Sequence, residues 1–277
     1  MKIFLFGSSG MLGNYIHNVL ISDKTITDIY DIIIINRDKY DVNSCDYKKL
    51  EDILSNSNQN DIIINCIGLI PQRNPNTRDL FLINSLFPIK LGEIANKYQM
   101  QFIHITTDCV FSGKKGAYDE TSDHDSDKIY GITKSLGEHI DGCIIRTSII
   151  GEEINNKLSL LEWVRQNKNG KIQGFSNFYW NGVTCLTLAE IIKKIIIEKK
   201  YWKGVRHIHS PNIISKYNLC KIINDIYNLN INIEYYELDE PKYMTLTTIY
   251  DNDLLVNILP IKEQIYKMSQ YSTDRLR

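Results

Sequence analysis

The sequence contains few cysteines, and none of them is paired in a C-x-x-C motif. Several stand inside apolar runs, which is typical of reduced thiols and not of a disulfide framework or a zinc site. The six are Cys45, Cys66, Cys109, Cys143, Cys185 and Cys220. We therefore expect no metal centre and a cytoplasmic location.

An excess of charge of either sign is absent too. Lysine and arginine number 32 against 33 aspartates and glutamates, which gives a formal net charge of -1. Nucleic acids and membrane surfaces are bound by basic faces, so we expect neither kind of partner. No apolar run approaches the length of a membrane span, and Met1 leads into an apolar segment without the pattern of a signal peptide.

A glycine-rich turn follows the first apolar run. Ile3–Phe6 has the continuous apolar character of a buried parallel strand, and an apolar helical pattern begins just after Gly13. Strand, glycine turn and helix in this order predict a dinucleotide site whose phosphates face the helix N-terminus. The predicted cofactor contacts in this turn are Gly7, Ser9, Gly10, Met11, Leu12 and Gly13.

The end of the second apolar run, Ile32–Ile35, bears on the choice of cofactor. An acidic residue there would bind the ribose hydroxyls of NAD. This chain has the neutral Asn36 followed by Arg37, which can pair with a 2′-phosphate, and Asp41 and Val42 are expected to border the same site. We predict NADPH as the cofactor, with NADH possible; the alternative is that Arg37 is merely solvated.

The third strand, expected at Asp61–Asn65, leads to Cys66, Ile67 and Gly68, which we expect beside the nicotinamide end of the cofactor. The following polar loop holds Arg73, a predicted substrate contact, because loops at the carboxyl ends of parallel strands border the ligand crevice. The sustained alternation of strand and helix predicts an α/β fold with a Rossmann-type, doubly wound parallel sheet.

Three side chains suit proton delivery to a carbonyl that receives a hydride. Tyr130 and Lys134 are four residues apart and share one face of a predicted helix. An ammonium beside a phenol lowers the phenol's pKa from about 10. Thr107, at the end of an apolar run, can aim its hydroxyl at the same point. The alternative is an exposed helix face on which a tyrosine lies along a lysine stem.

Taken together, these motifs resemble those of the extended short-chain dehydrogenase/reductases. Within them the chain looks most like the dTDP-4-dehydrorhamnose reductases and their sugar-nucleotide relatives. The matching segments are Gly7–Gly13, Asn84, Thr106–Phe111, Tyr130–Glu138, Ile145–Ser148 and Gly182–Thr184.

The resemblance implies that Thr107, Tyr130 and Lys134 form a catalytic triad in which Tyr130 donates the proton and Lys134 also holds the nicotinamide ribose. It implies a nucleotide-sugar substrate and, by analogy, a homodimer. The expected substrate contacts are Arg73, Asn84, Asp108, Trp180 and Asn181.

Cys109 departs from the pattern of the simple reductases, which usually have tyrosine after the Thr-Asp pair. Relatives that also epimerise, such as GDP-fucose synthase and plant-type UDP-rhamnose synthase, resemble this chain in having cysteine there, paired with a later histidine or lysine. Inverting a carbon next to a ketone requires a base and an acid on opposite faces. We predict Lys171 as the partner, with Lys168 as a second choice; the alternative for Cys109 is a small buried hydrophobe.

The second half is less informative. We expect residues 1–150 to form the dinucleotide-binding domain, rejoined by about 183–210, and 151–182 with 211–277 to form a smaller substrate-binding part. The aromatic run Phe175–Asn181 suits stacking on a base or sugar, or core packing. His207 and His209 are interpreted as structural histidines.

The sequence thus predicts NADPH-dependent reduction of a UDP- or dTDP-linked 4-keto-6-deoxy sugar, with C3 or C3/C5 epimerisation, in rhamnose-like deoxysugar biosynthesis. Two alternatives stay open. One is a non-catalytic, cofactor-binding regulatory subunit of the same fold. The other is a nucleotide-sugar 4,6-dehydratase or 4-epimerase, for which Asp108 matches the acid that a dehydratase requires.

Overall fold

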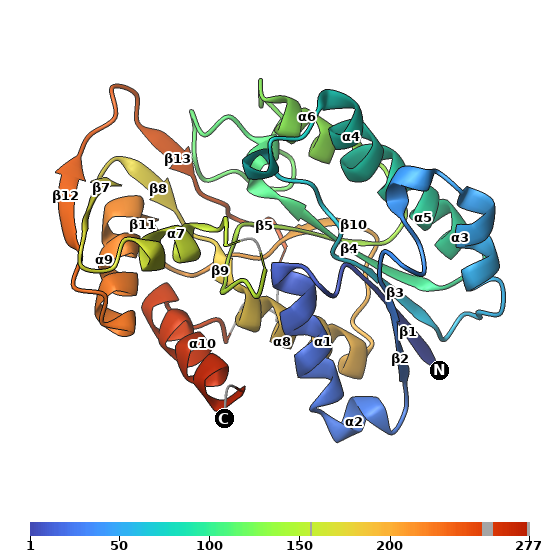
Figure 1. The fold of residues 1–277 in the computed structure, drawn as a ribbon. Helices are drawn as coiled ribbons and strands as arrows, with labels where there is room; N and C mark the ends of the chain where they lie inside the picture. The colour runs from blue at the N-terminus through green and yellow to red at the C-terminus, as the bar shows by residue number, and fades with distance from the viewer. Residues whose placement is uncertain (156, 251–256, 276–277) are drawn as a thin grey trace.

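A six-stranded parallel sheet lies at the centre of the computed structural model, which describes residues 1–155, 157–250 and 257–275 (Figure 1). The strand order is β10-β5-β4-β3-β1-β2, and each neighbouring pair is parallel. The strands are β1 (Lys2–Phe6), β2 (Asp31–Ile35), β3 (Ile62–Asn65), β4 (Gln101–Thr107), β5 (Cys143–Thr147) and β10 (Gly204–His207).

Side chains of β1 alternate between two apolar layers. Ile3 and Leu5 belong to the core on one face of the sheet, and Phe4 and Phe6 belong to the core on the other. A strand buried on both faces requires a continuous apolar sequence, which is what Ile3–Phe6 has.

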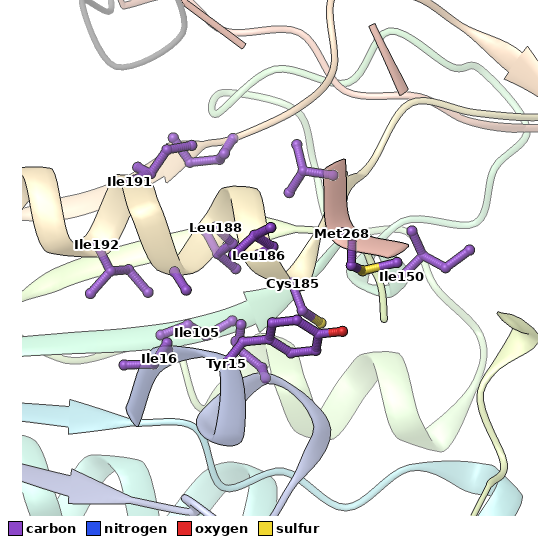
Figure 2. Close-up of a cluster of buried hydrophobic side chains, with 14 of the residues drawn as sticks. Tyr15, Ile16, Ile105, Ile150, Cys185, Leu186, Leu188, Ile191, Ile192 and Met268 are labelled. Carbon is purple, nitrogen blue, oxygen red and sulfur yellow. The ribbon is translucent and has the colours of Figure 1, made fainter. Parts of the chain in front are cut away.

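Helices cover both faces (Figure 1). On one side α1 packs against α8, and Figure 2 shows Ile16 of α1 and Ile192 of α8 in one cluster with Ile105 of β4. Helices on the other side include α3 and α5. The helices before β5 are α1 (Met11–Ile21), α2 (Lys24–Thr27), α3 (Tyr47–Leu54), α4 (Thr77–Phe81), α5 (Phe87–Lys97) and α6 (Ile129–Leu136). Short turns are η1 (Val42–Ser44), η2 (Pro71–Arg73), the π-helical η3 (Leu82–Leu86) and η4 (Asp108–Val110).

The chain after β5 adds small sheets beside the main one. Their orders are β11-β8-β13, β12-β7 and β6-β9. The strands are β6 (Ile149–Ile150), β7 (Lys171–Phe175), β8 (Phe178–Trp180), β9 (Val183–Thr184), β11 (Ile214–Ser215), β12 (Asn232–Tyr236) and β13 (Lys242–Met244). The helices are α7 (Leu160–Gln166), α8 (Cys185–Glu198), α9 (Lys216–Tyr227) and α10 (Ile261–Arg275). The chain returns to the main sheet at β10; the division into two domains stays a prediction.

The strand order reverses at β1, because β2 lies on one side of it and β3 on the other. Ligands of open α/β sheets bind at such a reversal, outside the carboxyl ends of the strands. The turns after β1 and β3 are therefore the place to look for a site. Within the described ranges, no helix is long and apolar enough to span a membrane.

Candidate active site

The glycine turn after β1 leads directly into the N-terminus of α1. Gly7 has φ +83°, a conformation that favours glycine, and its carbonyl accepts from the amide of Gly10 at 3.0 Å. A Cβ on Gly13 would lie 2.1 Å from that same carbonyl oxygen, so only glycine lets α1 start this close. No side chain caps α1 and no acidic residue stands in its first turn. Its first amides can therefore bind the phosphates of a dinucleotide.

A cavity of about 360 Å³ extends from this turn along the ends of β1 and β2. The predicted cofactor residues that line it are Gly7, Ser9, Gly10, Asn36, Arg37, Asp41, Val42, Cys66, Ile67 and Gly68. The Arg37 side chain is 76% exposed, and its Nε lies 3.7 Å from Asp41 Oδ1. An exposed pair at this distance is weak, so the guanidinium can exchange Asp41 for a phosphate.

A second cavity, of about 400 Å³, shares Gly10 and Gly68 with the first, so the two form one continuous hollow. Met11 and Leu12 line it. All three residues of the predicted triad line it as well, together with Asp108 and Cys109.

Thr107 ends β4 and begins the short turn η4. Its Oγ1 accepts from the amide of Cys109 at 3.2 Å and donates to Asp108 Oδ1 at 3.1 Å. The Cys109 thiol donates to the same carboxylate oxygen at 3.6 Å. Burial raises the pKa of Asp108 and raises the pKa of the Cys109 thiol to about 12, so the thiol stays protonated at neutral pH.

Helix α6 presses Tyr130 against this turn. A Cβ on Gly131 would lie 2.2 Å from the carbonyl oxygen of Cys109, so a side chain there would push the helix away. Tyr130 is half-buried and Lys134 is 4% exposed. The Lys134 ammonium donates to the carbonyl of Ile105 at 3.1 Å, and both residues line the cavity.

The sequence-based expectation that Lys134 lowers the pKa of Tyr130 is wrong. Burial raises the pKa of the phenol, the neighbouring Cys109 adds to the rise, and hydrogen bonding with Thr107 opposes it. Burial also lowers the pKa of Lys134, to about 8. The phenol is therefore protonated at neutral pH and suited to giving a proton.

Lys171 is not brought to Cys109. It lies on β7, where its side chain is 60% exposed and its Nζ pairs with Glu234 Oε1 at 2.5 Å. It lines a third cavity, of about 590 Å³, that Cys109 does not line. Lys168, the second choice, lines none of the cavities around Cys109. Lys216, at the start of α9, has a charge that acts on both Cys109 and Asp108. No motif in the sequence points to this lysine.

Three of the expected substrate contacts are buried residues that make contacts inside the protein instead. Asn84 is 1% exposed, and its amide group bonds the backbone N–H and C=O of Leu69 at 2.8 and 2.9 Å. The buried Asn181 bonds Leu246 in the same way, at 2.8 Å for both contacts. Trp180 is a core residue. Asp108 does line the active cavity, and Arg73 lines both it and the adjoining cofactor cavity.

Comparisons with known proteins show the family of the chain. The family model described as RmlD substrate binding domain matches residues 1–238. The dTDP-4-dehydrorhamnose reductase of Aggregatibacter actinomycetemcomitans is 24% identical over 239 residues, which cover 81% of this chain and 78% of that protein. Spore coat polysaccharide biosynthesis protein SpsK of Bacillus subtilis is 27% identical over 175 residues, 60% of each chain.

Solved structures share the fold. A dTDP-4-dehydrorhamnose reductase from Clostridium acetobutylicum has a TM-score of 0.81 at 19% identity, covering 99% of this chain and 100% of that one. The Bacillus anthracis enzyme, solved in complex with NADP, has a TM-score of 0.80 at 18% identity, covering 98% and 99%. UDP-glucose 4-epimerase of Thermotoga maritima has a TM-score of 0.77 at 15% identity, covering both chains completely. The predicted fold class is confirmed.

Proposed function

Because the chain belongs to the RmlD substrate binding domain family, we propose that it reduces the 4-keto group of a nucleotide-linked 4-keto-6-deoxy sugar with NADPH. The sequence-based recognition of this family is confirmed. The observation that carries the proposal is the meeting of Thr107, Tyr130 and Lys134 in a cavity that continues into the glycine turn. The names of the reductase relatives support the reaction, and the NADP complex of one of them supports the cofactor.

The cofactor, when bound, supplies the hydride. The chain itself supplies the proton: Tyr130, protonated because burial raises its pKa, donates it to the oxygen of the reduced carbonyl. Thr107 holds that oxygen through its hydroxyl. The Lys134 ammonium stabilises the negative charge that develops on the oxygen and on the phenol.

The third cavity suits the nucleotide part of the substrate. It adjoins the active cavity at Leu160 and is lined by Trp163, Phe175 and Phe178. Aromatic rings of this kind can stack on a pyrimidine base. A thymidine or uridine diphosphate lying there would place its sugar toward Cys109, and a dTDP-linked substrate is favoured over a UDP-linked one by the relatives' names.

The direct test mixes the protein with dTDP- and UDP-linked 4-keto-6-deoxyhexoses and NADPH, and follows NADPH absorbance and the products by NMR. Tyr130→Phe should lower kcat by about 10³-fold, while the Kd for NADPH changes less than about threefold. Tyr266→Phe, which alters an exposed ring on α10, is the matched control and should behave as the unaltered protein does.

Near-normal turnover by Tyr130→Phe would reject the role of the phenol. No NADPH oxidation with any sugar of the panel would favour a regulatory subunit. Purified protein that carries tightly bound NAD and gives no net reduction would favour a dehydratase or 4-epimerase. Pairing into a homodimer stays a prediction that sedimentation of the purified protein can check.

A further inference from the structure

His124 lies in the loop 112–128, which joins η4 to α6. Its ring connects that loop to two other elements of the fold. Nδ1 lies 2.5 Å from Ser135 Oγ of α6, and Nε2 lies 2.7 Å from Arg146 Nη2 of β5. The ring also packs against Phe111, with 5.7 Å between the ring centroids and 81° between the planes. One side chain thus joins the loop, the catalytic helix and the central sheet.

The partners of this ring define its protonation state. A guanidinium has only donors, so Nε2 of His124 accepts from Arg146. The single N–H of a neutral imidazole is then on Nδ1, where it donates to the hydroxyl oxygen of Ser135. His207 has the same arrangement, because its Nε2 accepts from Arg146 Nη1 at 2.8 Å and its Nδ1 donates to the carbonyl of Thr247 at 2.7 Å. This hydrogen-bond pattern requires both histidines to be neutral.

The charges around His124 leave no place for a second proton. A protonated ring would turn a donor and a positive charge toward Arg146, whose Nη2 lies 2.7 Å away. Glu138 Oε2 lies 3.6 Å from the ring, but both carboxylate oxygens of Glu138 already accept from Arg146. The remaining charges that act on the ring are those of His139 and Asp123, both exposed to solvent. Protonation of His124 and its bond to Arg146 therefore exclude each other.

The two residues after His124, Asp125 and Ser126, border the active site on the substrate side. They line a cavity of about 380 Å³ together with Cys109 and Tyr130. Cys109 and Tyr130 also line the active cavity, so the two cavities adjoin. We call Asp125 and Ser126 the cavity wall. Its position helps to decide how a substrate lies beside the catalytic phenol.

The cavity wall lies close against α6. A Cβ on Gly131 would lie 2.3 Å from Ser126 Oγ, so helix and wall are in direct contact. The Asp125 carboxylate accepts from the amide and the hydroxyl of Ser112, both at 2.7 Å, which ties the wall to the start of its own loop. The bond from His124 to α6 adds a hydrogen bond between this segment and the helix that carries the proton donor. Loss of that bond would let the wall move relative to the donor.

We propose that His124 is a positioning residue for the reduction, which holds the cavity wall against the catalytic helix while it is neutral and releases the wall when it takes up a proton. The inference rests on the proposed reductase activity and deepens it by adding a pH-dependent control of substrate binding. The sugar is the ligand affected, and not the nicotinamide cofactor, because the cavity wall lines neither of the two cavities beside the glycine turn.

The direction of the pH effect follows from the neutral form of the ring. Burial lowers the pKa of His124 below its ordinary value of 6.5, and Arg146 and His139 add to this, whereas Glu138 and Asp123 oppose it. The bond to Arg146 is present above the lowered pKa and is lost as the pH falls through it. Below that pKa the KM for the sugar should rise by up to about tenfold for each pH unit, while the Kd for NADPH changes less than about threefold.

Two variants at position 124 separate the hydrogen bond from the charge. The amide oxygen of His124→Gln can accept from Arg146, but the amide takes up no proton, so KM should stay within about threefold of normal and should not rise in acid. His124→Phe fills the space without an acceptor, so KM should be raised at least about tenfold at neutral pH while kcat falls less than about threefold. His139→Gln alters an exposed histidine three residues past the end of α6. As the matched control, it should keep the rise of KM in acid.

The measurement is steady-state kinetics between about pH 7.5 and about pH 5.5, with the nucleotide-linked keto sugar that the unaltered protein reduces fastest. Thermal melting of each variant checks its folding. NMR of protein labelled with ¹⁵N-histidine reads the ring without turnover, and the signal missing from His124→Gln identifies His124. Near neutral pH the proton should be on Nδ1. As the pH falls, Nε2 should gain a proton, and the amide signals of Asp125 and Ser126 should shift with the same midpoint.

Several results would overturn the inference. A KM for the sugar that does not change with pH, or an acid rise that persists in His124→Gln, would assign the pH effect to another group. An equal change in the Kd for NADPH would mark His124 as a residue of general structural importance. A proton on Nε2 near neutral pH would contradict the hydrogen-bond pattern itself. If no sugar is reduced at any pH, the proposed function fails, and the NMR titration still decides whether protonation of His124 releases the cavity wall.

Discussion

Arg146 of β5 and Glu138, two residues past the end of α6, form an ion pair through two hydrogen bonds inside the molecule. Arg146 is 2% exposed. Its Nη1 bonds His207 Nε2 at 2.8 Å, and its Nη2, which also bonds Glu138, bonds His124 Nε2 at 2.7 Å. Because α6 carries Tyr130 and Lys134, this pair ties the catalytic helix to the sheet that carries Thr107.

Removing one partner of this ion pair should lower the free energy of unfolding more than removing both partners does. Arg146→Met leaves the Glu138 carboxylate buried without a counter-charge, so the free energy of unfolding should fall by about 3–5 kcal/mol. The double variant Arg146→Met with Glu138→Leu should regain part of that loss. Urea denaturation measures all three proteins. A double variant no more stable than Arg146→Met alone would mean that the lost bonds to the histidines, and not the stranded carboxylate, cause the loss.

Reduction should weaken above about pH 8. Burial lowers the pKa of Lys134 to about 8, so its ammonium loses the proton as the pH rises through this value. The charge that stabilises the transition state is then lost, while Tyr130 is still protonated because its pKa is raised. The pH profile of kcat/KM reports the free protein. Lys134→Arg keeps its charge, so the activity that this variant retains should not fall above about pH 8. A fall that persists in the variant would come from the titration of another group.

Arg37 should decide between the two nicotinamide cofactors. Arg37→Ala removes a cation at the end of β2, beside the cofactor cavity, and should lower kcat/KM for NADPH about 10- to 100-fold, with little effect on NADH. The matched control is Arg78→Ala. That side chain is also 76% exposed and lies 3.7 Å from a neighbouring carboxylate, Asp79, but it lines neither cofactor cavity. Equal kcat/KM for both cofactors in the unaltered protein would remove the predicted preference.

Gly13→Ala should destabilise the fold. The new Cβ would lie 2.1 Å from the Gly7 carbonyl oxygen, and the obstacle is backbone, so α1 must shift off β1. A loss of about 1–3 kcal/mol in unfolding free energy is expected, as for other overpacked sites. Gly68→Ala meets nothing nearer than 3.8 Å and should keep its stability. Comparable melting temperatures for the two variants would contradict this account.

Features set by short-range spacing could be predicted from the sequence. The glycine motif spans only seven residues, from the end of a strand into the first turn of a helix. Tyr130 and Lys134 share a face because they are one helical turn apart. Thr107 was found because an apolar run ends there. In each case the residues that form the feature are neighbours in the chain, so no knowledge of tertiary packing was required.

Features set by long-range packing could not be predicted from the sequence. The charge of Lys216 acts on Cys109 only because α9 follows a strand that pairs with β8, and nothing around Lys216 in sequence distinguishes it from the other lysines. Lys171 was predicted as the partner of Cys109, although β12 supplies Glu234 as its partner. The direction of the Tyr130 pKa was also mistaken, because the burial that decides it is invisible in the sequence.

Asn84 has a consequence for how ligands enter. Its amide, presented by the π-helical turn η3, holds both backbone groups of Leu69, next to Gly68 on the rim of the cavity. That rim is therefore already rigid when a ligand arrives, and its conformational entropy was lost when the chain folded. Association at this edge then needs no ordering of the loop, which leaves more of the contact energy available for affinity.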